Sequence, residues 1–205
     1  MKVLLINGSP HVNGCTYTAL HAVASSLHEE GIETELFHIG TQPISGCIAC
    51  GKCKDNQCIL PGETVNFALS KAAEADGIIV GSPVYYASPN GSLISLLDRM
   101  FYAGNCLSYK PAAAIASARR AGTTAALDVI NKYFLMNNMP LVSSQYWNMV
   151  HGSCPEDVLK DLEGLQIMKT LGKNMAWLLK SINAGKSSGI IQPTLDAKIH
   201  TNFIR

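Results

Sequence analysis

The chain has 205 residues, of which 47% are hydrophobic and only 15% are charged, a composition that excludes a disordered chain. Its length is that of one domain with a single sizeable core. Sixteen basic and fifteen acidic side chains leave a formal net charge of +1, which is too balanced to drive binding to nucleic acid or to an anionic membrane surface. Partners must therefore be recognised locally, through a site.

Cysteine usage and hydropathy indicate the compartment. No apolar run reaches the roughly 18 residues that a membrane span needs, and residues 1–7 lack the layout of a signal peptide. The chain has seven cysteines, an odd number, and four of them crowd between Cys47 and Cys58. This distribution suits an intracellular ligand cluster better than a secreted disulfide framework. We therefore expect a cytoplasmic protein without a membrane partner.

The first 40 residues read as two strands that flank a helix. Residues 3–6 form a continuous apolar run that ends in a polar Asn-Gly-Ser-Pro loop, which predicts a buried parallel strand. Helical spacing follows up to Gly31, carried by Leu20, Val23, Ala24 and Leu27. Residues 33–38 then alternate between polar and apolar side chains, which indicates a strand near a sheet edge.

The same unit recurs in the middle of the chain. Residues 77–81 read as the third strand, with a loop at residues 82–91 and then a helix marked by Leu93, Leu96, Leu97, Met100 and Phe101. Residues 111–117 read as the fourth strand, and a helix marked by Ala126, Val129, Ile130, Tyr133 and Phe134 follows it.

The end of the chain supplies one more strand and a closing helix. Residues 141–145 predict the fifth strand, and the closing helix starts near Pro155 and continues past Leu171 to about Leu178. We expect one domain over residues 1–181, followed by a tail at residues 182–205 that is mobile or serves as an oligomer arm.

Strands that alternate with helices imply a parallel sheet with right-handed crossovers, and its helices must cover both faces. The predicted class is therefore α/β, with three layers and a five-stranded parallel sheet. In such sheets, ligands bind outside the carboxyl ends of the strands, where the winding direction switches. The loops after the first, third and fourth strands are the candidate site.

The first of these loops, residues 8–16, combines glycines, hydroxyl groups and an imidazole just before a helix start. Backbone amides at a helix start are unpaired and, with the helix dipole, attract a phosphate, and Ser9 and Thr16 add hydroxyl donors. The spacing matches neither the dinucleotide fingerprint nor the nucleoside-triphosphate loop. The sequence therefore predicts a monophosphate cradle, although a turn capped by Thr16 would explain the same residues.

The other two loops suit a flat ring. Residues 81–89 place two tyrosines and several backbone groups beside the predicted phosphate site, and residues 117–124 again end at a helix start. Arg119 or Arg120 offers a rigid donor fork for a ring edge or a phosphate, or is a solvated loop charge. A turn with core tyrosines is the alternative for residues 81–89. Tyr146 and Trp147 fit a pocket wall, a dimer interface or the core.

These loops resemble the NAD(P)H-dependent FMN reductase family. Its first loop reads Gly-Ser-Pro-Arg and then Gly-Asn-Thr, where this chain has Gly8-Ser9-Pro10-His11 and Gly14-Cys15-Thr16. The family's Gly-Ser-Pro-Val-Tyr loop and Asp-Arg helix correspond to residues 81–85 and to Asp98-Arg99. His11 in place of arginine carries only part of the positive charge near neutral pH, which implies weaker or pH-dependent phosphate binding. Cys15 in place of asparagine removes a side-chain donor.

The resemblance implies a flavodoxin-like α/β/α sandwich with strand order 2-1-3-4-5, bound FMN, and a homodimer or homotetramer. Backbone amides near Tyr86 and Ala87 and at residues 121–123 would then bond to the flavin ring. The residues expected to contact FMN are Ser9, His11, Gly14, Cys15, Thr16, Pro83, Val84, Tyr85, Tyr86, Ala87, Arg119, Ala121, Gly122 and Thr123.

The reaction that the resemblance implies is hydride transfer from NADH or NADPH to FMN. Electrons then pass to a small-molecule acceptor, such as a quinone, a nitro or azo compound, a flavin or a metal. Because the flavin carries the redox chemistry, no side chain has to act as an acid or base. The alternative is an electron carrier that relays single electrons between partner proteins, although carriers usually have a stronger charge patch than a net +1 suggests.

The four clustered cysteines, Cys47, Cys50, Cys53 and Cys58, are spaced so that one loop can wrap an iron-sulfur cluster. This segment resembles the compact cysteine motif of the iron-sulfur flavoproteins, a branch of the same superfamily in which a [4Fe-4S] cluster relays electrons to FMN. Tetrahedral zinc and free or disulfide-forming thiols are the other interpretations of the same four residues.

Overall fold

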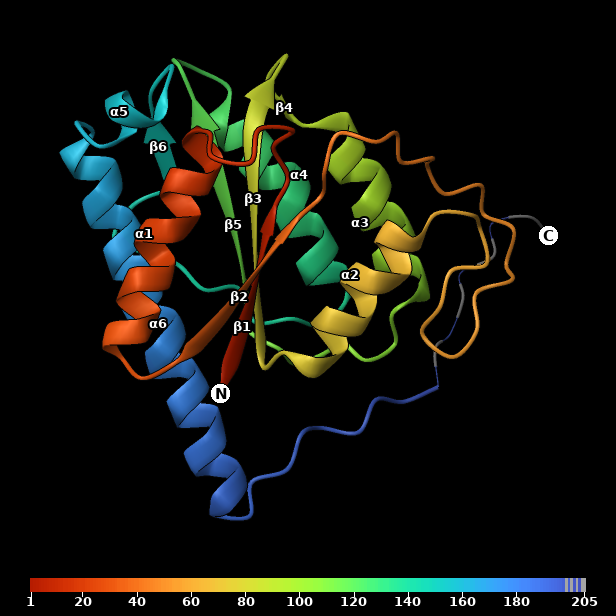
Figure 1. The fold of residues 1–205 in the computed structure, drawn as a ribbon. Helices are drawn as coiled ribbons and strands as arrows, with labels where there is room; N and C mark the ends of the chain where they lie inside the picture. Colours follow the sequence, from red (N-terminus) through yellow and green to blue (C-terminus); the bar gives the residue numbers. More distant parts are fainter. Residues whose placement is uncertain (198, 200, 202, 204–205) are drawn as a thin grey trace.

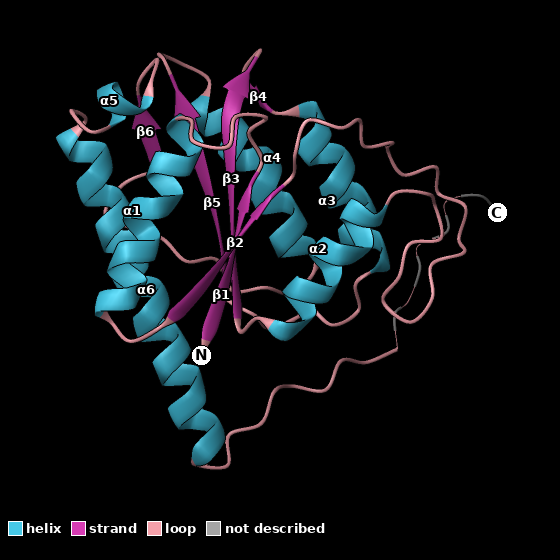
Figure 2. Ribbon diagram, in the orientation of Figure 1, coloured by secondary structure: helices cyan, strands magenta, loops and turns pink. Residues whose placement is uncertain are grey.

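The computed structural model describes residues 1–197, 199, 201 and 203 and shows a sheet between two layers of helices (Figure 1, Figure 2). The strands are β1 (Lys2–Asn7), β2 (Glu33–His38), β3 (Gly77–Tyr85), β4 (Ser88–Pro89), β5 (Ala112–Ala118) and β6 (Met149–His151). The helices are α1 (Cys15–Glu29), α2 (Glu63–Glu74), α3 (Gly91–Ala103), α4 (Thr123–Met136), α5 (Pro155–Val158) and α6 (Leu162–Ser187).

The sheet has the order β2-β1-β3-β5-β6, and every neighbouring pair in this order is parallel. This confirms the predicted five-stranded parallel sheet and its order 2-1-3-4-5. The two-residue strand β4 lies off this path and pairs antiparallel with the end of β3.

Alternate residues of the strands face two separate cores. In β1, Leu4 and Ile6 pack into the core beneath α2, α3 and α4, whereas Val3 and Leu5 pack into the core beneath α1 and α6. Because successive strand side chains point to opposite faces, a strand buried on both faces is apolar throughout. This explains the continuous apolar run that identified β1 in the sequence.

The fifth strand was predicted at residues 141–145, and this position is wrong. Leu141 forms only an isolated bridge to Ala112, after which the chain leaves the edge and rejoins β5 as β6. The polar side chains that follow turn to α6 instead: Gln145 donates to Gln166 Oε1 at 2.8 Å. An edge strand has one neighbour to hold it, so such bonds displace it readily.

The segment that interrupts this edge also carries the two aromatic residues whose role the sequence left open. Tyr146 and Trp147 pack edge to face, with ring centroids 4.5 Å apart, and both side chains are about half exposed. Trp147 therefore does not belong to the core of the described chain.

Two helices also differ from the expectation. Helix α2 was not predicted, although Val65, Ala68, Leu69 and Ala72 have helical spacing and are buried. The closing helix is broken, because the Asp161 carboxylate accepts from Gly164 N at 2.9 Å and so caps a new helix, α6. Helix α6 continues to Ser187, so the irregular tail begins after residue 187. No helix in the described part of the chain is long and apolar enough to cross a membrane.

Gly81→Ala is expected to lower the free energy of unfolding by about 1–3 kcal/mol, because a Cβ at this buried position would overpack the contact between β3 and α1. The added atom would lie 2.9 Å from Thr16 Cγ2 and 3.0 Å from Leu20 Cδ1. Chemical denaturation of both proteins measures the difference. Gly91→Ala is the matched control: a Cβ there meets nothing within 4 Å, and it should be neutral or slightly stabilising.

Candidate functional site

The loops after β1, β3 and β5 meet at the carboxyl edge of the sheet. Asn7 at the end of β1 pairs with Gly81 in β3, and Pro83 in β3 pairs with Ser117 in β5. Gly8 N donates to Gly81 O at 2.8 Å, which holds the first loop against β3. β1 and β3 are also the strands between which the winding direction reverses, so the edge has the position expected for a ligand site.

Hydrogen bonds from the side chains of Asn7, Ser9 and His38 fix the shape of the first loop. Asn7 is fully buried; its Oδ1 accepts from Ser9 N at 3.1 Å, and its Nδ2 donates to Val12 O at 3.3 Å. Ser9 Oγ accepts from His11 N at 3.1 Å, and His38 Nε2 donates to Ser9 O at 2.8 Å. The loop is therefore held in shape while residues 11–13 are exposed.

Helix α1 begins at this loop without a side-chain cap. Its N-cap residue is Gly14, and its first turn contains no acidic residue. The interpretation of Thr16 as an N-cap is therefore wrong. Thr16 Oγ1 instead lies 2.8 Å from Ser117 Oγ, which ties α1 to β5. The uncapped amides of α1 leave hydrogen-bond donors and the positive end of the helix dipole for an anion.

Cys15, the first residue of α1, is half-buried and packs against the core on the α1 and α6 side of the sheet. Its thiol is 3.6 Å from Gly152 O, and burial, the main cause, raises the pKa of the thiol. The thiol therefore stays protonated and bonds to the loop after β6, so it does not replace the asparagine side-chain donor that the resemblance would place here.

The second loop is shorter than predicted, since β3 continues through Tyr85 and turns back at Tyr86 and Ala87 into β4. Tyr86 and Ala87 both have left-handed backbones, with φ of 50° and 57°. The side chain of Tyr86 is fully exposed at the tip of this hairpin, and that of Tyr85 is 43% exposed. In a single chain, therefore, the backbone of the turn lies at the edge and the Tyr86 ring points into solvent.

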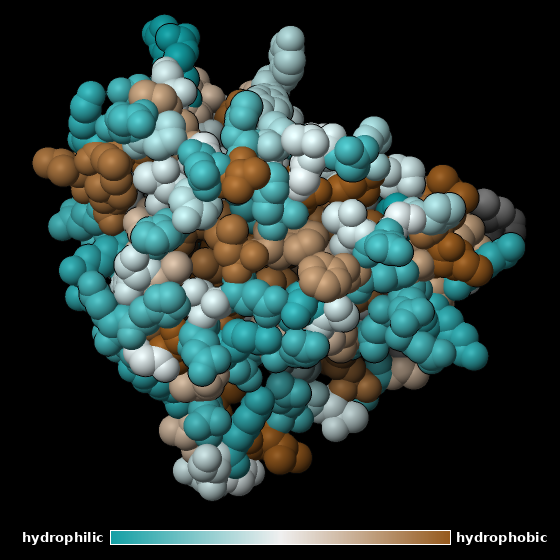
Figure 3. Space-filling view, viewed as in Figure 1, coloured by the Kyte–Doolittle hydropathy of each residue, from teal (hydrophilic) through white to brown (hydrophobic). Residues whose placement is uncertain are grey.

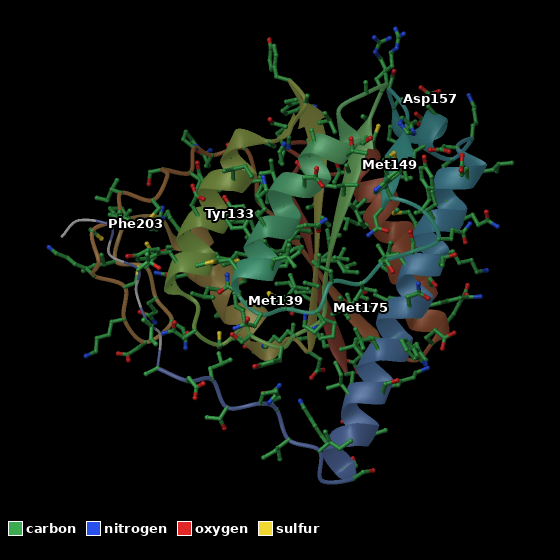
Figure 4. All side chains as sticks on the ribbon, turned by 180° about the vertical axis from the view of Figure 1, so that it is seen from behind. Tyr133, Met139, Met149, Asp157, Met175 and Phe203 are labelled. Atoms are coloured by element: carbon green, nitrogen blue, oxygen red, sulfur yellow. The ribbon has the colours of Figure 1, made fainter. Side chains whose placement is uncertain are left out.

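The third loop packs directly on this hairpin. Gly122 has φ +90°, and a Cβ there would lie 2.8 Å from Ala87 Cα and 3.0 Å from Val84 Cγ1. Arg119 and Ala121 are exposed, whereas Thr123 is buried. The hydroxyl of Thr123 donates at 3.2 Å to Sδ of Met149, a residue labelled in Figure 4. This bond ties the start of α4 to β6. Helix α4, like α1, begins at a glycine and has no acidic residue in its first turn.

The structure brings all three predicted loops to one edge and adds supporting residues that the sequence analysis missed. Asn90 Nδ2 donates to Gly8 O at 2.8 Å, and its Oδ1 accepts from Ser92 N to cap α3. Asn7 and His38 support the first loop as described above. Asn7 follows an apolar strand and precedes Gly8, a pattern that could have identified it; no local pattern marks His38.

The four-cysteine loop follows β2 and occupies residues 40–62. Cys47 is exposed, Cys50 and Cys53 are half-buried, and Cys58 is buried. Exposed Ile48 and Ile59 belong to the same loop, and Figure 3 shows hydrophobic residues at the right-hand edge, where Figure 1 places this loop.

The loop has the donor chemistry of a metal or cluster site. Its four donors are thiols, and Ala49 N already donates to Cys47 Sγ at 3.4 Å. Within the residues that the structure describes, however, no three cysteine, histidine or acidic side chains are close enough together to hold a metal ion. The residue types therefore fit a thiolate-bound group, and the loop has to close to bind it.

Cys58 is electrostatically distinct from its neighbour. Burial acts to raise the pKa of the Cys58 thiol, but hydrogen bonds from Arg99 and from the Leu60 amide outweigh it, so the pKa falls below its usual value. Burial, followed by the charge of Cys58, raises the pKa of Cys53. Of these two thiols, Cys58 therefore loses its proton more readily.

The parallel sheet, its order and the three loops at its carboxyl edge define a protein of the flavodoxin-like class. The chain belongs to the NADPH-dependent FMN reductase family, whose sequence model matches residues 1–153. It is thus an FMN flavoprotein of the oxidoreductase class.

Two relatives and one solved structure extend this assignment. The chain is 34% identical to an iron-sulfur flavoprotein of Methanocaldococcus jannaschii over 191 residues, which cover 89% of this chain and 99% of that one. It is 25% identical to an iron-sulfur flavoprotein of Methanosarcina thermophila, over 91% of this chain and 99% of that one. A flavodoxin from the domain Archaea superposes with a TM-score of 0.59 at 17% identity, covering 88% and 99% of the two chains. The latter likeness concerns the fold alone.

Gly122→Ala should separate the hairpin from the third loop and lower the free energy of unfolding by more than the roughly 1–2 kcal/mol of the left-handed backbone alone. Gly189→Ala is the matched control, since Gly189 has φ +86° but a Cβ there meets nothing within 4 Å. Denaturant unfolding compares the two variants. Equal losses would show that the contact of Gly122 with Ala87 does not matter.

Proposed function

We propose that the chain is an FMN-dependent oxidoreductase that takes reducing equivalents from NADH or NADPH. The acceptor is proposed to be a quinone, a nitro or azo compound, a flavin or a metal. The observation that carries the proposal is that α1 and α4 both begin at the same carboxyl edge with a glycine N-cap and no acidic residue in the first turn. Two uncapped helix starts suit a phosphate and an electron-rich ring edge.

In this proposal the FMN phosphate lies on the first loop. The hydroxyl of Ser9 accepts from His11 N, so its own proton is available for a phosphate oxygen. The amides of the first turn of α1 supply further donors, and exposed His11 supplies part of the positive charge. The residues assigned to the phosphate are Ser9, His11, Gly14, Cys15 and Thr16, the last acting through its tie to Ser117.

The flavin ring is assigned to the carboxyl edge of the sheet beside the hairpin and the third loop, which pack against each other. Backbone amides there orient the ring, and the close contact of Gly122 with Ala87 sets the spacing of the two loops. When bound, FMN supplies the hydride and electron chemistry, while the protein holds, orients and shields it. The residues assigned to the ring are Pro83, Val84, Tyr85, Tyr86, Ala87, Arg119, Ala121, Gly122 and Thr123.

Ser9→Ala should weaken FMN binding about tenfold or more, because a hydrogen bond to a charged group contributes roughly 1.5–3 kcal/mol. Riboflavin, which has no phosphate, should bind the variant and the wild type equally. Quenching of flavin fluorescence measures both affinities. Ser25→Ala is the control, because Ser25 lies on α1 away from the first loop and its hydroxyl donates to His21 O. Equal losses for FMN and riboflavin would place the phosphate elsewhere.

A second candidate is an electron carrier in which the four-cysteine loop holds a [4Fe-4S] cluster that exchanges electrons with FMN. It is favoured by two observations: the four thiols lie in one loop, and both full-length relatives described above are named iron-sulfur flavoproteins. Cys47, Cys50, Cys53 and Cys58 would be the ligands. Zinc on the same thiols is the competing occupant.

Anaerobically purified protein separates these candidates. A reductase should oxidise NADH or NADPH steadily in the presence of FMN and an acceptor quinone. A carrier should show no such turnover but should take up and release single electrons reversibly in a spectroelectrochemical cell. Iron with equimolar acid-labile sulfide indicates the cluster, and zinc without sulfide contradicts it. Protein that takes up no FMN would overturn both candidates.

We also propose that the chain forms a homodimer or homotetramer. The groove between α3 and α4, lined in part by Phe101 and Tyr102, exposes hydrophobic side chains, and Met136 at its rim is 72% exposed. Exposed apolar surface of this kind marks interaction sites. Light scattering of the FMN-loaded protein measures the assembly.

A further inference from the structure

Arg99 is the most deeply buried charged residue of the described chain. It lies in α3, one turn before the helix ends, and is 1% exposed. Arginine is almost never fully buried unless its charge and its five donors are satisfied. The hydrogen-bond partners of Arg99 therefore indicate its role.

Among the described residues, every hydrogen bond that Arg99 donates goes to the four-cysteine loop. Nε donates to Cys58 Sγ at 3.3 Å, and Nη2 donates to Leu60 O at 2.8 Å and to Pro61 O at 3.1 Å. Nη1 donates to Ser45 Oγ at 3.1 Å, near the other end of the loop. One guanidinium thus joins the two ends of the segment that carries the cysteines.

The charge of Arg99 is not matched by a carboxylate. None of the ion pairs among the described residues includes Arg99. Its one partner able to carry negative charge is the sulfur of Cys58. A buried cation without a carboxylate is costly, so the site favours a negatively charged group at this sulfur.

The side chain of Asn66 also fixes Cys58, through two hydrogen bonds to its backbone. Cys58 N donates to Asn66 Oδ1 at 2.8 Å, and Asn66 Nδ2 donates back to Cys58 O at 3.0 Å. The other three cysteines lie on a segment that is mostly exposed, where Ala49 and Gly51 have left-handed backbones. Cys58 is therefore the one buried and doubly fixed sulfur of the four, whereas Cys47 is exposed and Cys50 and Cys53 are half-buried.

We infer that Arg99 is the positioning residue of the four-cysteine loop: it presents Cys58 as the one preset ligand, on which Cys47, Cys50 and Cys53 close. It then stays beside that sulfur as a compensating positive charge. This inference rests on the proposed function, because it requires that the loop takes up a thiolate-bound cluster.

The two parts of the role have different consequences. Presenting Cys58 raises the affinity for iron, and Asn66 should share this part because it fixes the same residue from its backbone side. Charge compensation is specific to Arg99, since reduction of a cluster adds negative charge and a nearby cation favours it. The reduction potential therefore separates a positioning cation from a structural tie.

The experiment compares full-length Arg99→Met, Arg99→Lys and Asn66→Ala with the wild type, all loaded anaerobically with iron, sulfide and FMN. Lys173→Met, on the exposed face of α6 across the sheet, removes one positive charge as the control. Iron and sulfide per chain, apparent iron affinity against a chelator, and the midpoint potential are measured, and bound FMN reports that each variant is folded.

Arg99→Met should lose about tenfold or more in iron affinity, the usual effect of removing a residue that orients a metal ligand. The cluster that it retains should have a more negative potential. Asn66→Ala should lose affinity with an unchanged potential. Arg99→Lys should keep the potential but lose affinity, because an ammonium cannot reach both ends of the loop; it carries the test alone if Arg99→Met does not fold.

Two negative results have different meanings. If the wild type loads iron and the Arg99 variants match Lys173→Met in both affinity and potential, the role of Arg99 is overturned while the cluster stands. If the wild type binds FMN but no iron, the cluster proposal fails and the role of Arg99 fails with it.

Discussion

The whole site depends on the close backbone contact between β1 and β3 at their carboxyl ends. Gly8 N donates to Gly81 O at 2.8 Å, and a Cβ on Gly8 would lie 2.5 Å from Leu93 Cδ2. Because neither residue has a side chain, α1 and α3 approach the same point of the sheet from opposite faces. The first loop, the start of α1 and the start of α3 are all positioned by this contact. One geometric constraint therefore brings together groups that are distant in sequence.

Two different kinds of support then hold the two functional loops. The first loop is held by hydrogen bonds from the buried amide of Asn7 and from half-buried His38. The four-cysteine loop is held by a buried guanidinium. A buried cation suits a loop whose ligands are themselves negative when they bind a metal, whereas helix starts supply the positive field beside the first loop.

The sequence predicted the layers and the three loops, because buried parallel strands and amphipathic helices repeat with clear periods. The strand order came from the family resemblance. Prediction from the sequence failed where hydrogen bonds between residues distant in sequence determine the local structure. Gln145 leaves the edge strand for α6, and nothing near residue 145 in the sequence reports that partner. Likewise Thr16 carries the hydroxyl expected of a cap, yet it bonds to Ser117, 101 residues away. The exposed orientation of Tyr86 follows from a left-handed turn that its residue type disfavours.

Helix α3 contacts both the first loop and the four-cysteine loop. At the start of the helix, Asn90 Nδ2 donates to Gly8 O in the first loop. Near the end of the helix, Arg99 Nε donates to Cys58 Sγ. Arg99 follows Asn90 by nine positions, which places these contacts roughly 14 Å apart along the helix axis. The other end of the cysteine loop is attached to the same region, since it begins just after His38, which donates to Ser9 O. A rigid helix and one strand end therefore fix where the four-cysteine loop lies relative to the first loop.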